Sequence, residues 1–265
     1  MSCRSRGEFR FPQTPALTVY ARRPAGFDSG TTCRCPAETL DGCDNRQVPQ
    51  RPFPDPDRPY FTPSKRVAGD WSAHIATTLD RTATLLAGLT PEQWESPSKC
   101  DGWSVRDVAG HLAWRLGSPT SSLVREASKG VLRKGLRVNA YLDDIAKREG
   151  AAPTEELVAR IRSIAATKVV SQTRAGISEL TEAVVHTYDM TEALGLRIRL
   201  SPRSTSAVAL VRTRVPLSSA ASLAKRNRLR ATDARWQIGD KGPVVEGTAA
   251  QLVLKLFGRS VQLDD

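Results

Sequence analysis

The sequence feature that most constrains the fold is an abrupt change in pattern near Asp70. Ten of the 17 prolines lie in residues 1–66, and this stretch has no sustained apolar periodicity. Because proline fixes φ and has no amide donor, such a segment forms no long helix and buries little apolar surface. We expect residues 1–66 to form a disordered or irregular arm that contributes nothing to folding. A start site assigned too far upstream would produce the same composition.

After Asp70 the chain reads as almost entirely helical to about residue 198. Apolar residues recur at helical spacing from Trp71 to Leu89, which predicts a first helix. Ser104 and Asp107 match a capping box that begins a second helix. Residues 67–198 therefore predict a helical bundle with variable connections. The other predicted helix limits are Gly117 for the end of the second helix, 121–148 for one or two helices, Thr154–Ala165, and Gly176–Leu194 with Gly195 as C-cap.

Beyond residue 199 the pattern changes to short elements. A helix is expected within 204–214, and residues 229–238 and 243–247 predict two strands on either side of a glycine-containing turn. Thr248 then caps a last helix that runs to Phe257. Residues 199–265 therefore predict a small α+β domain.

The formal net charge of +11 raises the question of nucleic-acid binding. The excess lies in residues 1–66 and in 203–230, where seven Lys and Arg residues have no acidic neighbour, but no zinc finger or helix-turn-helix pattern accompanies it. We expect a solvated or anion-attracting surface, and nucleic acid is an unlikely partner. No stretch approaches the roughly 20 apolar residues that span a bilayer. The first ten residues lack the apolar region of a secretory signal, so we expect no membrane association and a cytoplasmic location.

The chain has three histidines, and two of them suggest a metal site. His186 follows Glu182 by four residues on a predicted helix, so both side chains project from one face, and His111 lies on a different helix. Two imidazoles and one carboxylate with an open position form the donor set of catalytic zinc sites, and the set also suits other divalent ions. From spacing alone, a surface hydrogen-bonded pair and a buried core histidine explain the same residues.

Three segments carry a resemblance to a known family. Residues 100–112 (CDGWSVRDVAGHL) and 182–189 (EAVVHTYD) resemble the signature segments of the mycothiol-dependent maleylpyruvate isomerase family, which belongs to the DinB-like metalloenzyme superfamily. Residues 231–259 resemble its sterol-carrier-protein-like C-terminal domain. The resemblance covers about residues 70–265. It implies a mainly α fold, with a DinB-like four-helix bundle followed by a small α+β domain.

The resemblance also implies a site and a chemistry. It places the family's metal ligands on His111, Glu182 and His186, with zinc as the expected ion. The family activates the thiol of mycothiol at this metal, for isomerisation of the maleylpyruvate type or for S-transfer, so the implied partners are this small thiol and a small anionic or electrophilic substrate. An arginine of the C-terminal domain assists there, and Arg259 is our catalytic candidate, although a helix C-cap would explain it equally. The alternative is a metal-binding bundle with a different hydrolytic or a non-catalytic regulatory role.

Five other residues near these segments have simpler interpretations. His74 matches no ligand position and is expected to be an ordinary first-helix residue. Trp103 is expected to anchor the second helix by packing. Cys100 could be a nucleophile or a fourth ligand, but we favour a structural role because the family takes its thiol from a cofactor. Asp107 and Asp189 each lie one turn from a ligand and either could orient an imidazole, although helix capping also explains Asp107.

Overall fold

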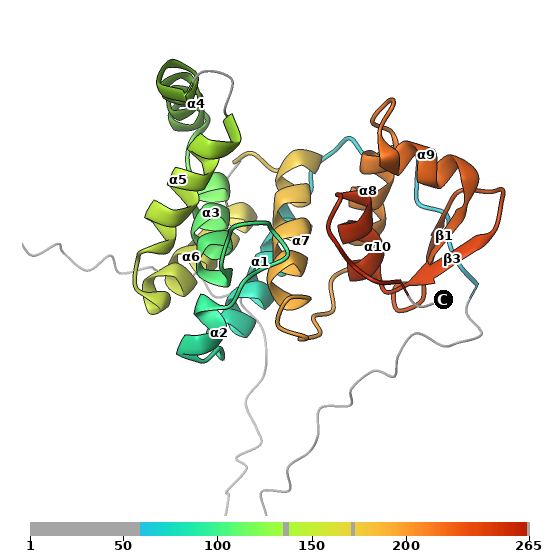
Figure 1. The fold of residues 1–265 in the computed structure, drawn as a ribbon, viewed down its shortest axis with the longest axis horizontal. Coiled ribbons are helices and arrows are strands. Elements are labelled where there is room, and N and C mark those ends of the chain that lie inside the picture. The colour runs from blue at the N-terminus through green and yellow to red at the C-terminus, as the bar shows by residue number, and fades with distance from the viewer. Residues whose placement is uncertain (1–58, 135–137, 171–172, 264–265) are drawn as a thin grey trace, which may run out of the picture. The chain divides into compact units, whose positions relative to one another are not determined.

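The chain divides into residues 1–50 and a compact unit of residues 51–265. The computed structural model describes residues 59–134, 138–170 and 173–263. Within these residues it contains ten helices and one three-stranded sheet, so the mainly α class with a small α+β part is confirmed (Figure 1). Residues 1–58, most of the predicted arm, lie outside the described residues.

The bundle core is formed by α1, α3, α6 and α7, which pack on one another along their apolar faces. Ile75, Leu112, Ile161 and Leu180, one from each helix, are fully buried at its centre. α5 packs on α3, and α4 packs on α5. The helices of this part are α1 Ser72–Leu86, α2 Pro91–Glu95, α3 Val105–Gly117, α4 Thr120–Lys134, α5 Val138–Gly150, α6 Thr154–Val170 and α7 Ile177–Thr191.

Capping explains where the two site-bearing helices begin. The Ser104 hydroxyl accepts from the Asp107 N–H at 3.2 Å, and the Asp107 carboxylate accepts from the Ser104 N–H at 2.9 Å, so the predicted capping box of α3 is confirmed. The Glu179 carboxylate accepts from the Gly176 N–H at 3.2 Å at the start of α7. Gly195, four residues after α7 ends, adopts the left-handed conformation with φ of 64°.

The C-terminal part joins two helices to the sheet. The sheet order is β2-β1-β3, with β1 antiparallel to β2 and parallel to β3. α8 and α10 pack against each other and against α7 (Figure 1). The elements are α8 Pro202–Thr213, α9 Ser219–Arg226, β1 Arg228–Ala231, β2 Trp236–Ile238, β3 Val244–Gly247 and α10 Ala249–Leu256.

The single strand predicted over 229–238 is wrong, because this segment forms a hairpin. Ala231 pairs with Trp236 and closes a four-residue turn. Arg235 has φ of 53° in this turn, and its N–H donates to the Ala231 carbonyl at 2.8 Å. Thr232 and Asp233 favour turns because their side chains bond to nearby backbone, and this signal was outweighed by the apolar residues on both sides.

Two short helices were not predicted. α2 begins at a capping box formed by Thr90 and Gln93, just after the segment that predicts the first helix. α9 is capped by the Ser218 hydroxyl, which accepts from the Ala221 N–H at 3.1 Å. Neither helix has the length over which apolar periodicity becomes distinctive, since α2 has five residues and α9 has eight.

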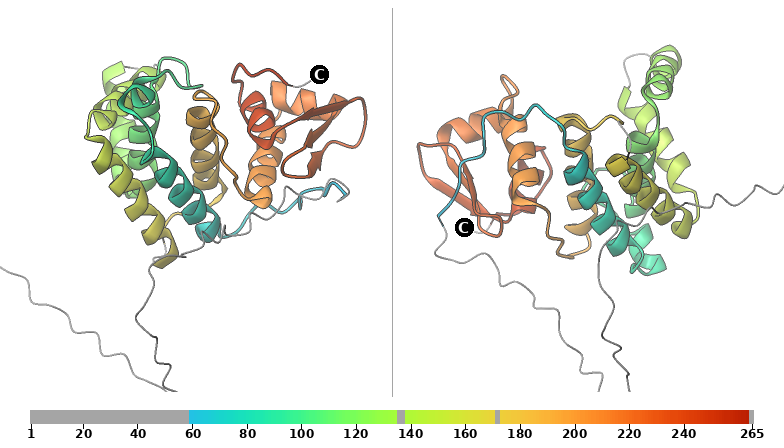
Figure 2. Two further views of the ribbon diagram at one scale, coloured as in Figure 1. Left: turned by 90° about the horizontal axis from the view of Figure 1, so that it is seen from below. Right: turned by 180° about the vertical axis from the view of Figure 1, so that it is seen from behind.

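Two residues of the predicted arm, Tyr60 and Phe61, contact the C-terminal sheet, beside which this segment runs (Figure 2). The Phe61 N–H donates to the Arg235 carbonyl and the Gln237 N–H donates to the Phe61 carbonyl, both at 2.9 Å. The Tyr60 ring lies 4.1 Å from the Arg235 guanidinium carbon. This short pairing covers the open edge of β2, contrary to the expectation that all of residues 1–66 contribute nothing to folding. Prolines flank Phe61 on both sides, at positions 59 and 63, so the sequence shows no strand pattern that would predict this pairing.

Candidate metal centre

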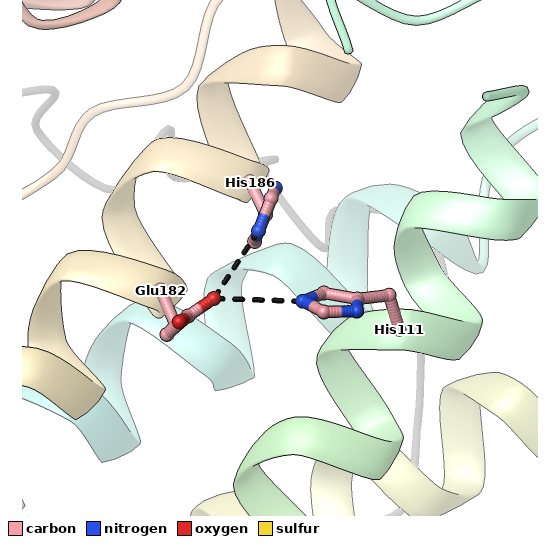
Figure 3. Close-up of side chains that lie close together, drawn as sticks. All are labelled: His111, Glu182 and His186. Carbon is pink, nitrogen blue, oxygen red and sulfur yellow. Dashed lines mark ion pairs between the residues drawn. The ribbon is translucent and has the colours of Figure 1, made fainter. Parts of the chain in front are cut away.

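Three side chains from α3 and α7 converge on one point (Figure 3). The Glu182 Oε2 atom lies 3.5 Å from His111 Nε2 and 3.2 Å from His186 Nε2. One ligand atom from each residue lies within 4.8 Å of the others, and no second group of this kind occurs in the described part of the chain. The structure therefore brings together the three residues that the sequence analysis selected.

These distances fit a bound divalent ion. Two atoms held tetrahedrally at zinc bond lengths of about 2.0–2.1 Å lie about 3.3–3.5 Å apart, which is close to both separations above. His111 is 5% exposed, and the His186 side chain is 12% exposed. The Glu182 side chain is 25% exposed, and a mostly buried set of two nitrogens and one carboxylate oxygen suits zinc and related divalent ions.

The electrostatics of the three groups are strongly coupled. Burial lowers the pKa of His111. Burial also opposes charge on His186, but its hydrogen bonds to the Asp189 and Glu182 carboxylates outweigh this effect and raise the pKa of His186 to about 9. Burial alone would raise the pKa of Glu182, yet hydrogen bonds from both histidines hold that pKa far below its usual range.

His186 is oriented by a chain of hydrogen bonds that reaches the C-terminal part. Its Nδ1 atom lies 3.0 Å from Oδ2 of Asp189, which is fully buried. Arg259 donates to Asp189 through Nε at 2.8 Å and through Nη2 at 3.1 Å. The catalytic candidate Arg259 therefore contacts Asp189, which faces His186, and not the three residues of the triad themselves. It also donates to the Cys100 sulfur at 3.6 Å.

His111 is oriented by aromatic packing. The Trp103 and Trp114 rings lie 4.9 Å and 6.0 Å from its ring centre, and Trp103 also stacks on His186 at 6.3 Å. The Nδ1 atom of His111 is buried without a hydrogen-bond partner among the described residues. Trp103 is therefore more than the predicted anchor of a helix, since it packs on both imidazoles. Its position eight residues before His111 gave no signal of this.

The structure also shows what surrounds the other residues that the sequence analysis considered near the site. Asp107 caps α3 and its carboxylate bonds Ser104, so among the two candidates only Asp189 contacts an imidazole. His74 lies away from the triad, with Nδ1 2.9 Å from the buried Ser204 hydroxyl. Cys100 is half-buried beside Arg259, and burial raises the pKa of its thiol to about 11.

Arg115 is a neighbour of the triad that the sequence analysis missed. Its Nε atom lies 3.4 Å from Oε1 of Glu182, the oxygen that does not face the histidines. It follows His111 by four residues, so the spacing rule that paired Glu182 with His186 would have placed it on the ligand-bearing face of α3.

Most of the basic 203–230 stretch is engaged within the molecule. Arg212 and Arg228 donate to the carbonyls of Leu256 and Gly242, each at 3.1 Å, and Arg214 donates to the Lys65 carbonyl at 2.7 Å. Arg203 packs over the Trp71 ring at 5.4 Å. These arginines tie elements together, which reduces what they can offer to an external polyanion. Within the described residues, no helix has the length and apolar content needed to cross a membrane.

Comparison with known proteins identifies the family. The model of the mycothiol maleylpyruvate isomerase N-terminal domain matches residues 75–215, more than half of the chain. A crystal structure of the mycothiol-dependent maleylpyruvate isomerase is similar, with 12% identity and a TM-score of 0.44 over 72% of this chain and 90% of that chain. A histidine-to-alanine mutant of that enzyme gives 13% identity and a TM-score of 0.42, over 71% and 88% of the two chains. No curated protein matches the sequence. The chain belongs to the mycothiol-dependent maleylpyruvate isomerase family.

Proposed function

We propose that the chain is a metal-dependent enzyme that uses mycothiol, either for cis–trans isomerisation of the maleylpyruvate type or for transfer of the thiol to an electrophile. The observation that supports this most is the convergence of two imidazoles and one carboxylate from α3 and α7, in a chain of this family. Its ligand-atom spacing fits one divalent ion.

In this proposal His111, Glu182 and His186 hold the ion, and zinc is the expected one because the donors are two nitrogens and one oxygen. When bound, the ion supplies a Lewis acid that lowers the pKa of a thiol, which is about 8.5 in water. The same activated thiolate serves an isomerase and an S-transferase, so the ligand set is compatible with both.

Asp189 and Arg259 prepare the site for this chemistry. By facing Nδ1 of His186, the Asp189 carboxylate directs Nε2 toward the ligand position and favours the tautomer that leaves Nε2 unprotonated. Arg259 compensates the buried charge of Asp189 through two hydrogen bonds. Its Nη1 atom makes no hydrogen bond to the described residues, and we propose that Nη1 binds a carboxylate of the substrate.

The state of Cys100 supports an external thiol. With its pKa raised to about 11, the Cys100 thiol would be ionised to only about one part in ten thousand at pH 7. A thiol in this state is a poor nucleophile. The chain therefore offers no activated thiol at this position, which agrees with a reaction that takes its thiol from mycothiol.

The test is turnover by the purified full chain, loaded with zinc. We expect maleylpyruvate to isomerise, or a thiol-reactive electrophile to be conjugated, only when mycothiol is added and only before the metal is chelated. Cysteine at the same concentration is the matched control thiol. Metal-dependent turnover that is indifferent to mycothiol would contradict the proposal and favour a hydrolytic role. Stable metal binding without either reaction would favour a non-catalytic role.

A further inference from the structure

The two oxygens of the Glu182 carboxylate face different partners. Oε2 faces both histidines, at 3.5 Å from His111 Nε2 and 3.2 Å from His186 Nε2. Oε1 lies 3.4 Å from Nε of Arg115. The carboxylate is therefore held between the proposed metal position and a guanidinium group that comes from the same helix as His111.

We propose that Arg115 is a positioning residue that holds Oε1 of Glu182 and so presents Oε2 alone to the metal. This inference rests on the proposed metal site and adds a residue to it. A ligating carboxylate that is not restrained can rotate or bind through both oxygens. Groups that hold the outer atoms of a ligand fix its orientation and commonly affect metal affinity about 10–100-fold.

Arg115 also contacts α7 one turn before Glu182. Its Nη1 atom lies 3.7 Å from Oε1 of Glu179, which precedes Glu182 by one helical turn on α7. Its Nη2 atom donates to the Ser178 hydroxyl at 3.4 Å. The guanidinium group therefore lies at ion-pair distance from two carboxylates of one helix, although its Nη1 atom makes no hydrogen bond to the described residues. A lysine ammonium lacks the planar group that reaches both carboxylates and Ser178.

Arg174 completes the arrangement at the end of α3. Its Nη1 atom donates to Oε1 of Glu179 at 3.1 Å, while Nη2 donates to the carbonyls of Arg115 and Ser118 at 3.1 Å and 2.9 Å. A cation at these last carbonyls of a helix is favoured by the helix dipole. The result is a connected series, Glu182–Arg115–Glu179–Arg174, that runs from the proposed ligand to the C-terminal end of the helix that carries His111.

The net contribution of such ion pairs to stability is small, because desolvation of the charges offsets their attraction. A positioning role therefore predicts that loss of Arg115 changes the metal site more than it changes the fold. Arg115→Met keeps the apolar stem and removes the charge. Glu179 retains its hydrogen bond from Arg174, so this variant leaves no buried carboxylate without a partner.

The experiment compares the full-length wild type with Arg115→Met, Arg115→Lys and a matched control, Arg106→Gln. Arg106 lies on the same helix but pairs with Glu95 at 3.0 Å, outside the site. Cobalt(II) is the probe, because its visible absorption reports the number and arrangement of ligands. Affinity is measured by competition with a chelator, and the melting temperature of the metal-free protein reports any structural effect.

We expect Arg115→Met to weaken cobalt binding by about 10–100-fold and to alter the visible spectrum. Arg115→Lys should recover part of the affinity, and Arg106→Gln should match the wild type. A wild-type spectrum and affinity in Arg115→Met would overturn the positioning role while leaving the metal site intact. Altered affinity with an unchanged spectrum would also overturn it, because orientation of the ligand would then be unaffected. If the wild type itself binds no cobalt, the proposed function and this inference both fall.

Discussion

The two ligands on α7 are supported in different ways. His186 faces a fully buried carboxylate, Asp189, which accepts two hydrogen bonds from Arg259 in the C-terminal part. Glu182 is held inside the bundle by Arg115, through an ion pair of 3.4 Å whose partners are 20% and 25% exposed. Because charge interactions strengthen as water is excluded, we expect the His186 support to be the stronger of the two.

This difference shows how the C-terminal part contributes to the site. Arg259 lies 70 residues after Asp189 in the sequence, yet it completes the hydrogen bonding of that carboxylate. The bundle supplies all three proposed ligands, whereas the orientation of one of them depends on a residue after α10. Substitutions in the C-terminal part should therefore affect metal binding through Asp189, whereas substitutions near Glu182 in the bundle should affect it through Arg115.

The largest effect is expected for Asp189→Asn. This change leaves Arg259 partly buried without its counter-charge and removes the anion that faces His186, so we expect about 3–5 kcal/mol of lost unfolding free energy and about 10–100-fold weaker zinc binding. Asp107→Asn is the matched control, because Asp107 also lies one turn from a ligand but caps α3. Denaturant unfolding and chelator competition measure both. Equal losses of metal affinity in the two variants would refute the distinction between them.

The reactivity of the Cys100 thiol, which lies beside Arg259, gives a pH-dependent measure of the environment of Arg259. Burial raises the pKa of Cys100 to about 11, so the fraction of this thiol that is ionised should rise with pH up to about that value. At pH 8 its alkylation should therefore be about a hundredfold slower than that of a free cysteine peptide. The nearby Arg259 cation opposes this rise, so Arg259→Gln should slow the reaction further. Iodoacetamide labelling followed by peptide mass spectrometry measures Cys100 specifically. Labelling at the rate of the free peptide would show that the thiol is neither buried nor shielded.

Arg259→Gln should have a smaller effect on the metal than Asp189→Asn, because Asp189 still faces His186. We expect zinc affinity to fall by about tenfold, and turnover to fall by more if Nη1 binds the substrate. Arg259→Lys keeps the charge but loses the paired hydrogen bonds, so it should lie between the wild type and the glutamine variant. Titration calorimetry with zinc and mycothiol-dependent turnover separate the two roles. If Arg259→Gln bound zinc more weakly than Asp189→Asn, Arg259 and not Asp189 would be the more important residue for the support of His186.

The smallest effect is expected at the sheet edge with which Phe61 pairs. Phe61→Pro removes the N–H that donates to the Arg235 carbonyl, which should cost about 1 kcal/mol and lower the melting temperature by about 2–4 °C. Phe61→Ala, which keeps this N–H, is the control. Zinc affinity should not change in either variant, because the hydrogen bonds of Phe61 go to Arg235 and Gln237 and those of the Arg259 side chain go to Asp189 and Cys100. A loss of metal binding would show that the whole C-terminal part, and not Arg259 alone, supports His186.

Local signals in the sequence predicted the parts of the fold that depend on neighbouring residues. The capping boxes at Ser104 and Thr248 are formed by residues three positions apart, so α3 and α10 begin where they were expected. The hairpin around Asp233 was missed because a strand pattern and a turn signal competed within ten residues. Pairing of Phe61 with β2 joins residues more than 170 positions apart, and no local pattern carries such information.

The residues of the site also divide into those that local spacing predicts and those that it does not. The spacing of Glu182 and His186 placed two groups on one helical face, while the resemblance supplied the match to His111 on another helix. The contact between Asp189 and His186 follows from spacing, since the two residues are one turn apart. The place of Arg259 beside Asp189 depends on the packing of α10 against α7, which the sequence alone does not determine.

Metal stoichiometry tests the central claim most directly. The full-length wild type, His111→Ala, His186→Ala and His74→Ala are reconstituted with zinc, desalted and analysed for bound metal, with circular dichroism as the check on helical content. We predict one equivalent of zinc in the wild type and in His74→Ala, because His74 faces Ser204 away from the site. We predict none in the other two variants, with helical content nearly intact. One equivalent of zinc in either His111→Ala or His186→Ala, or none in the wild type, would contradict the account.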